Sequence, residues 1–226
     1  MASIFGKSEL SGAWKERFLD VKKLNEYTQK GLKTEISDVI IKDYKLDGAL
    51  FINASFRDVE WTSTITEKLS FTNTVFRNNI FNNVEFTDAK FTNVTFEDSE
   101  FNGTSFWKSQ LTGVKFIRCK FKSKSDFSTL KSSTVEFDHS IIEETSFAAS
   151  NAVLTIHNST LEDVRFVGMI FPSSLTFENS KLKDIDMDSS KLSKLVMDNV
   201  KGGGASGFNG GSVAEVDIRN SDMAFG

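Results

Sequence analysis

Proline is almost absent from this 226-residue chain, which contains one proline, whereas average usage of about 5% would give about eleven. Because proline has no backbone N–H to donate, its near absence indicates that almost every backbone N–H is needed as a donor, as in stacked strands. One cysteine excludes an internal disulfide, and two histidines leave little for a zinc site.

Long hydrophobic runs are missing as well. No apolar stretch approaches the roughly 18 residues that a membrane span needs. The first ten residues, MASIFGKSEL, lack the basic-then-apolar layout of a signal peptide. We therefore predict a cytoplasmic protein outside the membrane, with secretion by a signal-independent route left open. The formal charge of −4, with 26% charged and 12% aromatic residues, does not fit a disordered chain.

Phenylalanine, by contrast, occurs 22 times, and most copies follow a five-residue period. Every fifth position from 51 to 121 gives fifteen residues, of which twelve are phenylalanine. The fifteen are Phe51, Phe56, Trp61, Thr66, Phe71, Phe76, Phe81, Phe86, Phe91, Phe96, Phe101, Phe106, Leu111, Phe116 and Phe121. After one-residue slips the series resumes as Phe127, Phe137, Ile142, Phe147, Ile156, Leu161, Phe166, Phe171, Phe177, Leu182, Met187, Leu192, Met197, Phe208, Val213, Ile218, Met223. The regularity indicates an internal repeat of five residues.

A five-residue period fits neither a helix nor a straight strand. In a helix five residues advance about 500°, so successive positions share no face, and in a strand an odd step alternates faces. The chain must therefore turn once per repeat. With corners of about 90°, four repeats close a square coil in which residue i stacks under i+20. Residues that tolerate positive φ, such as Asn73, Asn93 and Gly113, lie two positions after the large residue and are typical of such corners.

The segments Phe-Thr-Asn-Val-Thr-Phe (91–96) and Phe-Asn-Asn-Val-Glu-Phe (81–86) resemble the pentapeptide-repeat family. The resemblance implies an all-β fold, a right-handed quadrilateral β-helix, here of about nine coils. The large residue of each repeat and the small residue two places before it would point inward. We expect an N-terminal capping helix over 1–33, the β-helix over 34–200, and a Gly-rich loop with an irregular last coil over 201–226.

The two ends of such a rod expose strand edges, which need covering. Apolar residues recurring every three or four positions from Leu10 to Tyr27 predict a helical cap at the N-terminal end, although a surface-membrane helix is the alternative. The segment from Gly202 to Gly207 is predicted to be a flexible loop. Met223 and Phe225 at the uncovered C-terminal end predict a homodimer through that end, or a longer chain.

Candidate groups for catalysis are few. His139 and His157 have no Cys or Asp at ligand spacing, and no Gly-x-Ser-x-Gly motif occurs. The glycine-rich stretch near residue 205 lacks the Lys-Ser/Thr ending of a phosphate loop. Cys119 occupies a small inward position and is expected to be buried and inert. We predict that the protein is not an enzyme and has no catalytic residues, cofactor or metal.

Charge is distributed in bands along the sequence. Residues 107–131 carry a net +6 and residues 132–164 a net −6. The basic band could be a nucleic-acid site next to Trp107. However, an offset of one coil places Lys108, Arg118 and Lys120 over carboxylates, and the slip places Lys115 and Lys122 under Glu136 and Glu143. This pairing argues against nucleic acid as a partner.

The sequence predicts a non-catalytic binding or scaffold module that contacts an unknown protein partner through its outer faces. Outward apolar residues mark the possible contact: Trp107, Ile117, Val167 and Ile170. The alternative, implied by the family resemblance, is a DNA mimic that binds a type II topoisomerase and confers drug resistance. A threonine column, Thr72, Thr92 and Thr112, resembles that of ice-binding β-helices, but without a second column it gives little support to that function.

Overall fold

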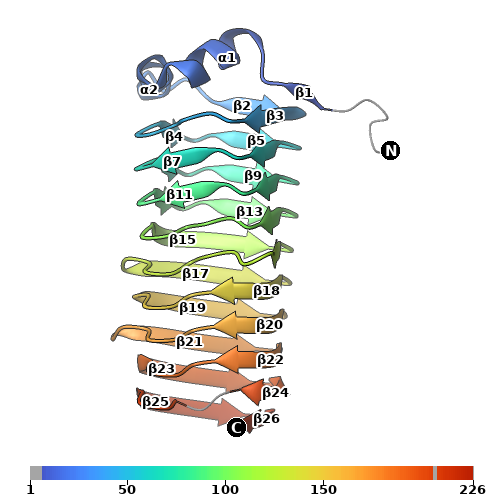
Figure 1. Cartoon of the computed structure of the whole chain (residues 1–226), viewed down its shortest axis with the longest axis vertical. Coiled ribbons are helices and arrows are strands. Elements are labelled where there is room, and N and C mark those ends of the chain that lie inside the picture. The colour runs from blue at the N-terminus through green and yellow to red at the C-terminus, as the bar shows by residue number, and fades with distance from the viewer. Residues whose placement is uncertain (1–6, 206–207, 226) are drawn as a thin grey trace.

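The computed structural model describes residues 7–205 and 208–225, which form an elongated rod of stacked parallel strands (Figure 1). Ten strands of one side lie one above another, so the chain makes nine turns between the first and the last. The two short helices lie at the N-terminal end, and the chain leaves at the opposite end (Figure 1). The predicted quadrilateral β-helix is confirmed.

The strands of the described residues form three parallel sheets, of which two run along the rod and the third joins two adjacent turns. The first sheet contains β1 (Ser8–Glu9), β3 (Val39–Lys42), β6 (Glu60–Thr62), β10 (Ile80–Asn82), β14 (Glu100–Asn102), β16 (Lys120–Lys122), β18 (Ile141–Ser146), β20 (Thr160–Arg165), β22 (Lys181–Asp186), β24 (Lys201–Ala205) and β26 (Asp222–Phe225). The second contains β2 (Glu35–Ser37), β4 (Leu50–Ile52), β5 (Ser55–Arg57), β8 (Ser70–Thr72), β9 (Val75–Arg77), β12 (Lys90–Thr92), β13 (Thr95–Glu97), β15 (Gln110–Ile117), β17 (Ser133–Asp138), β19 (Ala152–His157), β21 (Ser173–Glu178), β23 (Lys191–Asp198) and β25 (Ser212–Arg219). The third contains β7 (Ile65–Glu67) and β11 (Glu85–Thr87).

The rod has four faces, each defined by its column of inward residues. Face 1 contains Ile41, Trp61, Phe81, Phe101 and Phe121; face 2 contains Leu46, Thr66, Phe86, Phe106 and Phe127; face 3 contains Phe51, Phe71, Phe91 and Leu111; face 4 contains Phe56, Phe76, Phe96, Phe116 and Phe137. All of these side chains are buried. Apart from Thr66, whose hydroxyl donates to the Glu85 carbonyl, they form the apolar axis of the rod.

Stacking follows the predicted offset of twenty residues in the first half. Phe96 lies opposite Phe76 and Phe116, with ring centroids 4.6 and 4.9 Å away. From Phe121 onward the offset changes to 21, then 19, as Phe137 pairs with Phe116 and Ile156. The predicted slips therefore keep the large residues in their columns.

The corners confirm the predicted turn residues. Asn73, Asn93 and Gly113 all have positive φ, between 49° and 63°. At these corners the amide of Asn93 donates a hydrogen bond of 3.3 Å to the Asn73 side chain, whose own amide donates to Asn53. Asparagine thus allows the left-handed backbone and also links successive turns.

Phe171 departs from the predicted inward series. Its side chain is 58% exposed, and Ser173 takes the inward position instead, where its hydroxyl donates to the carbonyls of Ser150 and Ile170. The reason is the extra residue of this turn, in which Phe177 rather than residue 176 lies opposite Ile156. The added residue pushes Ile170 and Phe171 outward.

The N-terminal cap contains two helices, α1 (Gly12–Leu19) and α2 (Val21–Gln29), rather than the single predicted helix. The chain bends at Asp20, whose backbone is non-helical and whose carboxylate accepts from the Lys23 N–H that opens α2. Phe18 is buried against Phe51 at 5.8 Å, although it lies outside the five-residue series.

The glycine-rich segment is also different from its prediction. Residues Lys201–Ala205 form strand β24, which pairs with β22 and β26, rather than a flexible loop. Gly202 lies opposite Leu182, so close that a Cβ atom would be 1.7 Å from the Leu182 carbonyl oxygen. Glycine is needed here because the two backbones approach closely. Residues 206 and 207 lie outside the described residues.

Candidate functional site

The corner between faces 2 and 3 carries a continuous uncharged strip. Backbone hydrogen bonds link the outward residues of successive turns, from Lys108 N–H to Ser128, from Thr129 N–H to Ala148, and from Ala149 N–H to Val167. These bonds stack Trp107, Ser128, Ala148 and Val167 in one column. We call the following residues the corner strip: Trp107, Ser128, Thr129, Ala148, Ala149, Val167, Gly168, Ile170 and Phe171.

The strip has apolar ends and a low middle. Trp107 is 39% exposed at one end, and Ile170 and Phe171 are more than half exposed at the other. Between them, Ala149 and Gly168 have left-handed backbones at their corners. Small residues at these positions separate the two exposed apolar ends.

Three of the four residues predicted to contact a partner therefore lie together. Trp107, Val167 and Ile170 belong to the corner strip, whereas Ile117 lies in β15 on face 4, beside the buried Phe116. The sequence series missed Phe171, because it assigned that residue to the interior. Only the added residue of this turn, visible as a register slip, could have indicated its exposure.

A hollow of about 580 Å³ adjoins Trp107. It is lined by residues of four successive turns: Glu67, Lys68, Thr87, Asp88, Trp107, Lys108, Thr129 and Lys131. The Lys108 ammonium lies over the Trp107 ring, 3.8 Å from its centroid. Lys131 forms an ion pair with Asp88, the carboxylate over which the offset of one coil places Lys108. The hydrogen bond from Lys131 lowers the pKa of the Asp88 carboxyl.

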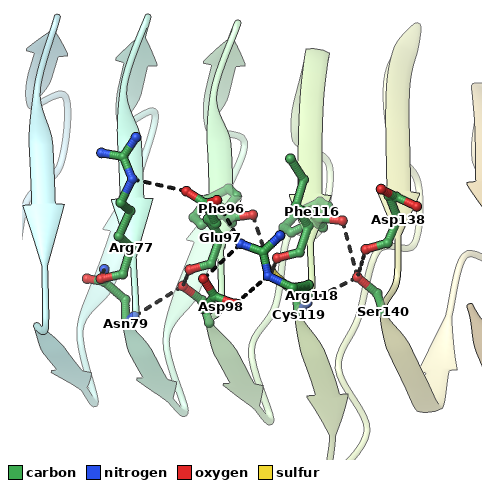
Figure 2. A network of polar contacts seen from close by, with 12 residues as sticks. Arg77, Asn79, Phe96, Glu97, Asp98, Phe116, Arg118, Cys119, Asp138 and Ser140 are labelled. Atoms are coloured by element: carbon green, nitrogen blue, oxygen red, sulfur yellow. Dashed lines mark hydrogen bonds and ion pairs between the residues drawn. The ribbon is translucent and has the colours of Figure 1, made fainter.

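The basic band of residues 107–131 is largely neutralised, as Figure 2 shows for its centre on face 4. Arg118 donates to Asp98 at 2.7 Å and to Glu97 at 2.7 Å, and Arg77 donates to the same Glu97 at 3.0 Å. These hydrogen bonds lower the pKa of both carboxyls. Lys115 pairs with Glu136 at 2.7 Å, as predicted.

The remaining bases of the band do not form one surface. Lys122 lies on face 1, directly after Phe121, which lies opposite Ile142, so the register agrees with the predicted stacking of Lys122 under Glu143. Within the described part of the chain, Lys122 forms no ion pair with Glu143. Lys120 lies 4.0 Å from Glu100, also on face 1, while Lys131 faces Asp88 at the opposite side. Because the bases surround the rod, they offer no single track for a phosphate backbone.

Carboxylates gather at the corner between faces 1 and 2. Glu143 lies directly opposite Glu162, and the next residues along the chain occupy successive left-handed corners. We call these residues the acidic ridge: Glu143, Glu144, Glu162, Asp163 and Asp184. Glu162 pairs with Lys183, and the other four have no ion pair among the residues described. Like charges at this spacing repel each other.

The two histidines pair with carboxylates. His157 lies 3.0 Å from Glu178, and His139 lies 2.8 Å from Asp138. Within residues 7–205 and 208–225, no group of three or more His, Cys, Asp or Glu side chains is placed to hold a metal ion. Burial raises the pKa of the Cys119 thiol to about 12.

The C-terminal end of the rod exposes apolar residues of the inward series. Val216 and Ile218 of β25 lie opposite the buried Leu195 and Met197, yet both are about half exposed. Met223 is partly buried, and the Phe225 side chain lies outside the described residues. No further strand covers β25 within the described part of the chain.

The threonine column continues through four turns, since Thr72, Thr92, Thr112 and Thr134 lie opposite one another. The neighbouring outward column on face 4 reads Val75, Thr95, Lys115 and Glu136. A second threonine column is therefore not formed there. None of the helices among the described residues has the length and apolarity needed to cross a membrane.

Comparison with known proteins identifies the repeat. The family model described as "Pentapeptide repeats" matches eight copies over residues 70–107 and 89–123. A search of curated protein sequences gives no significant match.

Solved structures with a similar trace include two trypsin-treated forms of QnrB1, a plasmid-mediated fluoroquinolone resistance protein. The first is 9% identical, with a TM-score of 0.41 and coverage of 79% of this chain and 91% of that chain. The second is 12% identical, with a TM-score of 0.35 and coverage of 84% and 90%. The adhesin PfbA of Streptococcus pneumoniae is 6% identical, with a TM-score of 0.32 and coverage of 91% and 94%.

Proposed function

Because the chain is a member of the pentapeptide-repeat family, in which the repeat describes a scaffold, we propose that it is a non-catalytic module that binds a partner protein through its corner strip. The observation that carries this proposal is the grouping of Trp107, Val167, Ile170 and Phe171 on one corner. Because phenylalanine fills the core of the rod, a partner would contact the outer faces of the protein.

The strip has the character of an interface rather than of random exposure. Aromatic residues are enriched where proteins bind each other. On this corner, exposed aromatic side chains lie at both ends of a surface that carries no charge between Ser128 and Phe171. Isolated exposed apolar residues are ordinary on protein surfaces, but here three large ones, Trp107, Ile170 and Phe171, lie at the two ends of one uncharged strip.

The test compares protein capture by matched variants. The protein, the double variant Trp107→Ala/Phe171→Ser and the face 4 control Ile117→Ser are immobilised, and captured proteins are quantified by mass spectrometry. We expect the same proteins to be enriched on wild type and control and to be lost from the double variant. An identical set on all three would show that the corner strip is not the binding surface.

The acidic ridge supports a second candidate, a DNA mimic that binds a type II topoisomerase. Its unpaired carboxylates repel one another, which is a cost that a cationic partner surface would relieve. The ridge spans only three turns, and Lys181 and Lys183 lie beside it. Gyrase supercoiling measured with increasing protein tests this function: inhibition that is lost on Glu144→Gln/Asp163→Asn would support it, and unchanged supercoiling would exclude it.

We also propose a homodimer through the C-terminal end. The exposed Val216 and Ile218 support this assembly, as does the edge of β25 that no strand of the described residues covers, because a second rod end would cover both. Light scattering across a concentration series is the test. A dimer that becomes a monomer on Val216→Asp/Ile218→Asp is expected, whereas a monomer at high concentration would remove the proposal.

A further inference from the structure

We propose that the corner strip takes an extended acidic peptide segment of the partner, with two apolar side chains four residues apart and carboxylates next to the one that packs on Trp107. Two features of the uncharged strip point to this ligand: Trp107 lies beside three lysines at one end, and a second apolar group, Ile170 with Phe171, lies at the other. This inference rests on the proposed binding function of the strip and names the chemistry of its partner.

The spacing follows from the rise of the solenoid. Val167 lies three turns beyond Trp107 in the same column. At about 4.8 Å per turn this is roughly 14 Å, and an extended peptide rises about 3.4 Å per residue, so the two anchors are about four residues apart. Side chains alternate along an extended chain, so residues i and i+4 point to the same side. An even spacing therefore lets both anchors face the rod.

The middle of the strip suits a peptide backbone. Ser128, Thr129, Ala148, Ala149 and Gly168 are small and uncharged. A backbone lying along this column would meet no long side chain between the anchors. The apolar projection at Ile170 and Phe171, on the face 3 side, would then contact the second anchor together with Val167.

The charge at the tryptophan end selects an acidic segment. Lys68, Lys108 and Lys131 converge on the hollow against Asp88 and Glu67, which leaves an excess of one positive charge. Asp88 is already paired with Lys131, while the ammonium of Lys108 contacts the Trp107 ring. Lys68 and Lys108 form no ion pair among the described residues. A carboxylate beside the apolar anchor would bind these two lysines while the anchor packs on the ring.

The same surface is unsuited to nucleic acid. The column of Trp107 ends in acidic residues, since Glu67 lies two turns before it and Asp188 follows Val167. A phosphate backbone running along the strip would meet a carboxylate at each end. A short peptide needs only one or two acidic groups, placed at the hollow.

The experiment uses fluorescent peptides and the full-length protein, with binding measured by fluorescence anisotropy. The probes are Glu-Asp-Phe-Ser-Thr-Ser-Leu and its reverse, since the direction is not fixed by the strip. The controls are Glu-Asp-Phe-Ser-Thr-Leu-Ser, with the anchors on opposite sides, and Gln-Asn-Phe-Ser-Thr-Ser-Leu, without charge. An oligothymidylate of fifteen nucleotides tests the nucleic-acid alternative.

We expect one of the two probes to bind at least fivefold more tightly than both controls. Lys68→Gln/Lys108→Gln and Trp107→Ala should each weaken binding of the probe at least fivefold. Lys122→Gln, which removes a lysine on face 1 with no ion pair among the described residues, should change it less than twofold. Equal binding of probe and controls, no binding of either probe, or tighter binding of the oligothymidylate would each overturn the inference.

The outcomes separate this inference from the proposed function. If the double variant loses its captured proteins but the probes fail, the strip is an interface for a partner of different chemistry. If the captured proteins are unchanged, the strip is not the interface and the proposed function itself fails.

Discussion

Phe96 and Phe171 provide a matched test of the solenoid, because the five-residue series assigns both to the interior and the structure separates them. Phe96 is fully buried, with Phe76 and Phe116 stacked above and below it and Phe101 in edge contact at 5.3 Å. Phe171 is 58% exposed. The same substitution, Phe→Ala, should therefore have very different effects at the two positions.

The magnitude follows from the contacts that each change removes. Truncation of a buried phenylalanine costs about 3–5 kcal/mol. Phe96→Ala should lie at the upper end, because the rod is packed on all sides of the ring and two stacked pairs, each worth about 0.5–1.5 kcal/mol, are lost as well. Phe171→Ala should remain within about 0.5 kcal/mol, as for other surface substitutions.

Urea denaturation followed by far-UV circular dichroism measures both variants against wild type. Midpoints are converted to free energies only if the slopes agree, because a solenoid can unfold in parts. Equal destabilisation by the two substitutions would contradict the placement of Phe171 outside the core. A loss below about 1 kcal/mol for Phe96→Ala would contradict the stacked axis itself.

Three further predictions concern charge, the thiol and glycine. Arg118 donates hydrogen bonds to the Asp98 and Glu97 carboxyls and holds their pKa values below the usual 3.8 and 4.5, so this stabilisation is present above pH 4.5 and disappears as the pH falls through the lowered pKa values. The difference in unfolding free energy between wild type and Arg118→Ala should therefore shrink as the pH falls below 4.5. A difference independent of pH would refute this prediction. Burial raises the pKa of the Cys119 thiol to about 12, so Cys119 should not react with a thiol reagent at pH 8 until urea unfolds the chain. Rapid labelling of the native protein would show instead that the thiol is accessible. Gly202→Ala should lower the unfolding free energy by about 2 kcal/mol or more, because the added Cβ meets the backbone of the preceding turn. Gly48→Ala, with open space around its Cβ, should lower it by about 1 kcal/mol because of the positive φ alone. Urea midpoints that rank the two variants in the opposite order would contradict this prediction.

The fold could be predicted from the sequence because its cause is local and repeated. A large residue every fifth position fixes a corner per repeat, and corner residues such as Asn73 and Asn93 confirm where the turns lie. Phe18 could not be placed in this way, because its burial depends on how two helices dock on the first turn rather than on the repeat. For the same reason the break at Asp20 was not predicted.

The candidate site was only partly accessible from the sequence. The distance of sixty residues between Trp107 and Val167, three coils, already indicates one column, whereas Ile117 lies two repeats from Trp107 and therefore on the opposite side. The pairing of Lys131 with Asp88 was not predictable by counting, because side chains reach diagonally and their separation is no multiple of the coil. To predict the exposure of Phe171, it would have been necessary to know which turn accommodates the extra residue.

The regular offset of twenty residues also determines how this rod can change length. Removal of the twenty residues from Thr72 to Phe91 would take out one complete layer, with every remaining ladder still in register. Removal of five residues from the same stretch would preserve the local repeat equally well, but everything beyond it would turn by a quarter revolution relative to the capped end. Lys68 would then lie on a different side of the molecule from Trp107, so insertions and deletions in such a chain act as rotations of one surface against another.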